Sequence, residues 1–71
     1  MNADQEKIIN AFFMGEKEKG NALMRKMITE HGGFTKLGKK TGFGSTNIHR
    51  MISKKGNPTS RNFFILLRSI E

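Results

Sequence analysis

The chain is 71 residues long, with 35% hydrophobic and 27% charged residues and no cysteine. This fits one small domain whose core no disulfide or cysteine-bound zinc supplements. Its 13 Lys and Arg against six Asp and Glu give a net charge of +7, which favours a polyanionic partner such as nucleic acid. The longest apolar run, residues 63 to 67, is far shorter than the ~18 residues of a membrane helix, and the polar, acidic start is unlike a secretory signal. We therefore expect one cytoplasmic domain over residues 1–71 that binds no membrane.

Apolar residues recur at helical spacing along the chain, and no segment alternates as a strand does. The first helix is predicted by two i, i+4 pairs: Ile8, Ile9, Phe12 and Phe13. We expect Asp4 to be its N-cap. The second is expected from Asn21 to the stop at His31–Gly32–Gly33, and its apolar residues are Leu23, Met24, Met27 and Ile28. Of these two helices, the residues expected in the core include Phe12, Phe13, Met24 and Met27.

Three more helices are predicted in the second half of the chain. Leu37 marks a short third helix that follows Thr35, and Gly44 or Ser45 begins the fourth. The fourth contains Ile48, Met51 and Ile52. The fifth contains the stripe Phe63, Leu66, Leu67 and Ile70, and Thr59 is its expected N-cap. The predicted fold class is all-α, with five short helices.

Residues 34–53 have the layout of a helix-turn-helix. Two short helices that cross closely need a small residue where they touch, and Gly38 meets that need. The turn needs a residue that tolerates positive φ, and Gly42 meets that need. The apolar residues at the offsets that hold such a pair together are Leu37, Phe43, Ile48 and Met51. The sequence therefore predicts that the second helix of the motif enters the major groove of DNA.

The excess of positive charge lies in the same half of the chain. Residues 1–32 carry five basic and five acidic residues, whereas residues 33–71 carry eight basic residues and one acid, Glu71. The residues expected to contact bases are Ser45, Thr46, Asn47, His49 and Arg50. Arg50 is the strongest candidate, because its planar guanidinium fits guanine. The residues expected to contact phosphates are Thr35, Lys36, Lys39, Lys40, Lys54 and Lys55.

Each of these assignments has a simpler alternative. Ser45 could cap its own helix, His49 could be half-exposed without a ligand, and any of the lysines could be a solvated surface charge. Thr35 is expected both to cap the first helix of the motif and to bind a phosphate.

The sequence also resembles the addiction-module antidote family, antitoxins with a helix-turn-helix of the lambda-repressor type. The resemblance covers most of the chain and is clearest from Gly33 through Gly42 and from Ile48 to Thr59. It implies five helices, binding to duplex DNA, repression of the protein's own operon, and a small ribonuclease toxin as partner. Gly38 stands where the family usually has Ala, and Gly44 where a Ser usually caps the recognition helix.

Ile65 is expected at a homodimer interface. It lies about 200° around the fifth helix from Phe63, and the resembling family tends to carry a polar residue there. Two-fold dimers suit palindromic sites. The alternative is a single exposed isoleucine, which is common on protein surfaces.

Enzymatic and metal-binding functions are not expected. Residues 33–39 match the start of a phosphate-binding P-loop, but Lys40 stands where that motif needs Ser or Thr for magnesium. The second half of the chain is too poor in acids for a Ser-His-acid set, and neither His31 nor His49 has a second ligand nearby. We expect no cofactor and no metal. The predicted function is a DNA-binding repressor and antitoxin; the alternatives are a stand-alone or phage-type repressor without a toxin, and a protein that only inhibits another protein.

Overall fold

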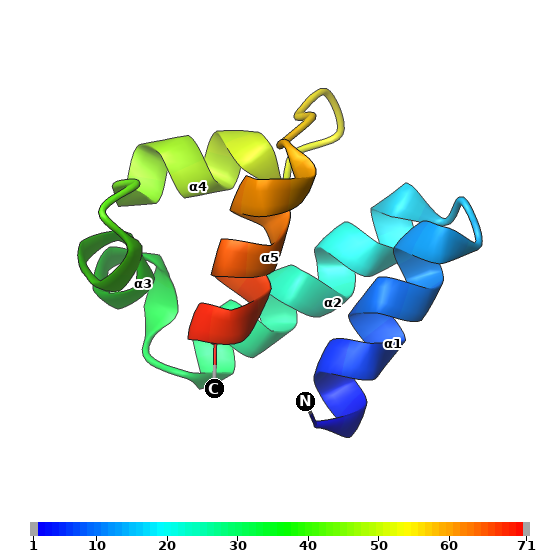
Figure 1. Cartoon of the computed structure of the whole chain (residues 1–71). Coiled ribbons are helices and arrows are strands. Elements are labelled where there is room, and N and C mark those ends of the chain that lie inside the picture. The colour runs from blue at the N-terminus through cyan, green and yellow to red at the C-terminus, as the bar shows by residue number, and fades with distance from the viewer. Residues whose placement is uncertain (1, 71) are drawn as a thin grey trace.

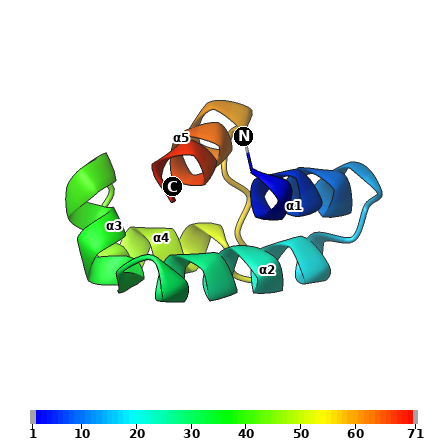
Figure 2. The same cartoon turned by 90° about the horizontal axis from the view of Figure 1, so that it is seen from below.

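A computed structural model describes residues 2–70, and within that range the chain forms five α-helices and no strand. The helices are α1 (Ala3–Phe13), α2 (Lys17–Glu30), α3 (Gly33–Thr41), α4 (Ser45–Met51) and α5 (Ser60–Ser69). Figures 1 and 2 show α5 between α1 on one side and α3 on the other. The predicted all-α class with five helices is confirmed.

The core takes side chains from all five helices. Its buried members are Ile8, Met24, Met27, Ile28, Leu37, Ile48, Met51, Ile52, Leu66, Leu67 and Ile70. Phe12, Phe43 and Phe63 are partly buried and pack against them. The predicted apolar stripe of the fifth helix therefore faces the core, and Thr59 caps that helix as expected, because its Oγ1 accepts a hydrogen bond from the Asn62 N–H at 3.1 Å.

The N-cap of α1 is Asn2, so the prediction of Asp4 is wrong. The Asn2 Oδ1 accepts from the Gln5 N–H at 2.9 Å, and the Asn2 N–H donates to the Gln5 Oε1 at 2.8 Å. This reciprocal capping box starts the helix at Ala3 and places Asp4 inside its first turn. Gln5 is fully buried, and its Nε2 donates to the Leu67 carbonyl at 2.9 Å, which joins the start of α1 to the end of α5.

Phe13 does not belong to the core, contrary to the prediction. Its side chain is 88% exposed, whereas Phe12 packs against the core, and Met24 and Met27 are buried. Phe13 ends α1 and lies about 140° around the helix from the buried Ile8. Helical spacing alone did not separate the two phenylalanines, because either could extend the Ile8–Ile9 face.

The second helix begins at Lys17, four residues before the predicted start at Asn21. The chain turns instead at Gly15, where φ is +78°. Gly20 lies inside α2 and is buried. A Cβ atom at Gly20 would lie 2.5 Å from the Phe12 Cε2, so this glycine lets α1 and α2 approach closely.

The α3–α4 unit has the two glycines that the sequence predicted. Gly42 has φ +82°, and its N–H donates to the Gly38 carbonyl at 2.9 Å. A Cβ atom at Gly38 would lie 2.7 Å from the Ser45 backbone nitrogen and 2.9 Å from the Gly44 carbonyl carbon. The two helices therefore approach more closely than an alanine at position 38 would allow.

Candidate nucleic-acid interface

The two faces of α4 differ sharply in burial. Ile48 and Met51 are buried in the core, which determines which side of the helix faces inward. The rest of the helix surface carries the five residues predicted to contact bases: Ser45, Thr46, Asn47, His49 and Arg50. Ser45 is half-buried and the other four are exposed. The structure thus brings the five together on one short helix.

Neither Ser45 nor Thr35 caps its helix, so the capping prediction for Thr35 is wrong and the simpler alternative for Ser45 does not hold. The N-cap of α4 is Gly44, and Ser45 is the first helical residue without a side-chain capping bond. The N-cap of α3 is Gly32, with φ +111°, and Thr35 is an exposed residue in the first turn. The reason in α3 is that the helix begins at Gly33, ahead of the expected position.

His49 stacks on Phe34 of α3. The ring centroids lie 3.7 Å apart and the planes are inclined by 14°. One face of the imidazole is therefore covered, while its nitrogens lie at the ring edge, where hydrogen bonds form. The stack was not predicted, because sequence spacing does not show which side chains meet across two helices.

The lysines predicted to contact phosphates are all exposed: Lys36, Lys39, Lys40, Lys54 and Lys55. They come from two parts of the chain, α3 and the segment that follows α4. The Lys40 Nζ donates to the Ser69 carbonyl at 2.8 Å, at the end of α5. A cation is favoured there by the partial negative charge of the helix C-terminus. Lys36 and Lys40 line a hollow of about 50 Å³ beside the end of α5.

Lys54 and Lys55 follow α4 directly. The Lys54 Nζ lies 4.0 Å from the Glu18 Oε1 of α2, and both side chains are largely exposed. Exposed pairs of this kind contribute only about 0–1 kcal/mol, so the pair does not prevent Lys54 from turning to a phosphate. Lys55 lines an open hollow of about 350 Å³ with Asn47 and Arg50 of α4. This hollow extends the polar face of α4 along the chain that follows it.

Ile65 is half-buried on α5 and is not one of the residues that pack against the core. Its neighbour Phe64 is 44% exposed and makes an edge contact with Phe63, at 5.4 Å between ring centroids. Phe64 is thus the larger apolar side chain on this part of α5, and the sequence reasoning did not single it out.

Three polar residues of α2 that sequence reasoning missed contact the segment after α4. Lys17, Asn21 and Arg25 each donate hydrogen bonds to backbone carbonyls between residues 52 and 56. Their spacing of four residues is the only signal that the sequence offers, since it places them on one face of α2.

Within residues 2–70, no group of three or more His, Cys, Asp or Glu side chains lies together in a way that could hold a metal ion. No helix in this range has the length and apolar character needed to cross a membrane. Comparison of the chain with protein families, with curated proteins and with solved structures finds no match.

Proposed function

We propose that this protein is a sequence-specific repressor that binds duplex DNA through α4. In this proposal α3, the turn at residues 42–44 and α4 are a helix-turn-helix of the lambda-repressor type. The first residues of α4 read base edges in the major groove, and the neighbouring lysines bind phosphates.

The observation that carries the proposal is the polar face of α4. Thr46, Asn47, His49 and Arg50 are exposed on a helix whose other side is anchored in the core. Hydroxyl, amide, imidazole and guanidinium groups are those that pair with base edges. The chain has no Asp or Glu between residues 31 and 70, so no carboxylate in that stretch repels a phosphate backbone.

The biological role that we propose is that of an antitoxin which represses its own operon. This part rests on the resemblance of residues 33–59 to the addiction-module antidote family, above all of Gly56–Thr59 and of the segment that precedes it. A small ribonuclease toxin is the partner that this role requires.

Selection from a random duplex library tests the DNA-binding part. The purified protein is incubated with the library and with the DNA upstream of its own gene, at two salt concentrations. We expect enrichment of an inverted repeat that also occurs upstream. Binding without enrichment, lost steeply with salt, would leave only a basic surface. No binding would contradict the proposal and would favour a protein partner.

A homodimer is the assembly that we propose for an inverted repeat. Ile65→Glu would place a charge at its interface beside the exposed Phe64. Sedimentation of the wild type should give the mass of a dimer, and that of the variant the mass of a monomer. A monomeric wild type, or a variant of unchanged mass, would exclude this interface.

A further inference from the structure

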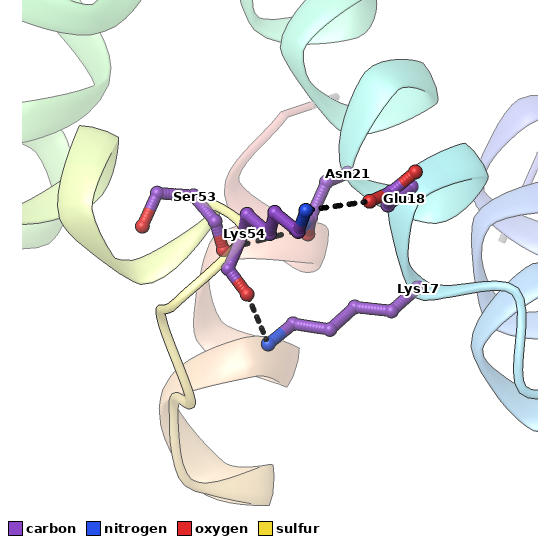
Figure 3. A network of polar contacts seen from close by, with 5 residues as sticks. All are labelled: Lys17, Glu18, Asn21, Ser53 and Lys54. Atoms are coloured by element: carbon purple, nitrogen blue, oxygen red, sulfur yellow. Dashed lines mark hydrogen bonds and ion pairs between the residues drawn. The ribbon is translucent and has the colours of Figure 1, made fainter.

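Three polar side chains of α2 lie in a row on one face of the helix: Lys17, Asn21 and Arg25, here called the α2 row. All three donate to backbone carbonyls of the segment that follows α4, residues 52–56. The acceptors are the carbonyl oxygens of Ile52, Ser53, Lys54 and Gly56. Figure 3 shows Lys17 and Asn21 reaching this segment from α2. The row is therefore a polar link between the N-terminal helices and the end of α4.

Asn21 is the buried member of the row, with 5% of its surface exposed. Its Nδ2 donates to the Ser53 carbonyl at 3.4 Å. The same carbonyl accepts from the Gly56 N–H at 3.0 Å, which closes the turn after α4. Because a buried amide without a partner costs about 1–3 kcal/mol, this contact ties the turn to a fixed point on α2.

Lys17 and Arg25 bind carbonyls on either side of the one that Asn21 binds. The Lys17 Nζ donates to the Gly56 carbonyl and, at 3.2 Å, to the Lys54 carbonyl. The Arg25 Nη2 donates at 3.4 Å to the carbonyl of Ile52, the C-cap of α4. The last carbonyls of a helix lack partners within it and carry partial negative charge, so cationic donors stabilise them. Arg25 thus adds a donor from outside α4 to its C-cap carbonyl, and Lys17 binds carbonyls of the segment that follows.

Segment 52–56 packs directly on the backbone of α4. Gly56 is buried, and a Cβ atom there would lie 2.5 Å from the Met51 carbonyl oxygen and 2.8 Å from its carbon. With no side chain between the two backbones, a shift of the segment is transmitted to the last turn of α4. The α2 row is therefore coupled to α4 through hydrogen bonds to a segment that lies directly against the backbone of the helix.

We infer that the α2 row consists of positioning residues for base recognition. By holding segment 52–56, it fixes the direction in which α4 presents Asn47 and Arg50. The N-terminal helices then contribute to sequence discrimination without contacting DNA. This inference rests on the proposed function of α4 as a recognition helix.

Two variants and a matched control test the inference. Asn21→Ala removes the buried donor, and Lys17→Met removes a donor while it keeps most of the aliphatic stem. Lys19→Met removes the same charge from an exposed position of α2, and within residues 2–70 the Lys19 side chain makes no hydrogen bond or ion pair. For each protein we would measure the melting temperature and the affinity for two probes: the duplex enriched by library selection and a duplex pool of random sequence.

We expect Asn21→Ala and Lys17→Met to lower the ratio of enriched to random affinity by about tenfold, the size of one lost base contact. The salt dependence should not change, because the lysines that bind phosphates remain. Lys19→Met should leave the ratio unchanged. Lys17 is the first residue of α2 and lies outside the core, so its variant reports on recognition even if Asn21→Ala unfolds.

The possible failures are distinguishable. A variant that loses affinity for both probes by the same factor keeps the wild-type ratio, and a lowered melting temperature would then show that the row is only structural. A variant that keeps both affinities would show that the row has no role in binding. Either outcome would overturn the inference and leave the proposed function intact. A wild type that prefers no duplex would overturn both.

Discussion

The two helix pairs of this protein each close on a buried glycine, but the glycines face different neighbours. In the α1–α2 pair, Gly20 faces the ring of Phe12, a side chain that can rotate. In the α3–α4 pair, Gly38 faces the backbone of Gly44 and Ser45 at the start of α4. The first crossing can therefore adjust through one side chain, whereas the second can change only if α4 itself moves.

The two helix pairs also differ in charge. Positive and negative residues balance up to residue 32, whereas eight of the nine charged residues after it are basic. The less adaptable crossing therefore lies in the basic half of the chain and carries the polar face of α4. Of the two crossings, the more restricted one therefore holds the helix whose direction matters for the proposed function.

Gly38→Ala should have the largest effect, because it places a methyl group against backbone. We expect the free energy of unfolding to fall by about 1–3 kcal/mol, the usual cost of overpacking, despite a gain of up to ~1 kcal/mol in helix propensity. Thermal unfolding measures this, at about 4–8 °C per kcal/mol for a domain of this size. Lys39→Ala, at an exposed position of the same helix, is the control. Equal melting temperatures for Gly38→Ala and the wild type would mean that α3 and α4 can separate freely.

Arg50→Ala should affect recognition and leave the fold intact, since Arg50 is exposed. We expect a loss of discrimination at one base position of about 1–3 kcal/mol. Competition binding with single-base variants of the enriched duplex measures it. A uniform loss across all the variants would show that Arg50 binds a phosphate.

Lys39→Ala should have a smaller effect, and one that does not depend on sequence. Removing one phosphate contact lowers the affinity for every duplex alike and reduces the salt slope by about 1. Titration at several salt concentrations measures that slope. Identical behaviour of Lys39→Ala and Arg50→Ala would contradict the division into base and phosphate contacts.

Gly20→Ala should have the smallest effect, and it sharpens the contrast with Gly38. The added methyl group displaces the Phe12 ring, but α2 gains up to ~1 kcal/mol in helix propensity. We expect the free energy of unfolding to change by less than about 1 kcal/mol, measured by thermal unfolding beside Gly38→Ala. A loss as large as that of Gly38→Ala would show that Phe12, which packs edge-on against Phe63 at 4.8 Å, cannot move.

Local signals predicted much of this fold. Thr59, Gly42 and the apolar stripe of α5 were assigned correctly, because caps, turns and helical periodicity depend on neighbours in the sequence. Gly38 was also assigned correctly, since a close crossing of two short helices leaves few choices of residue. Which side chains contact bases and which contact phosphates stays a prediction.

Several of the errors arose where contacts between distant segments determine the structure. Gly20 looks like a chain break in the sequence, yet it packs on Phe12 within a continuous helix. Asn21 was expected at the start of the helix, yet it lies inside α2, where it is buried and bonded to Ser53. The start of α2 has no side-chain cap at Glu16, so no local signal marks it. The capping box at Asn2 and Gln5 was readable from its spacing and was missed in favour of Asp4.

The stack of His49 on Phe34 gives α4 a characteristic proton NMR signal. Protons held above an aromatic face are shielded by its ring current, so the imidazole C–H signals of His49 should lie upfield of their usual positions. The chain has only two histidines, so these signals are few and readily assigned. On addition of DNA, their return downfield would show the His49 ring leaving Phe34 for the duplex, and retained shielding would show the pair binding as one rigid surface.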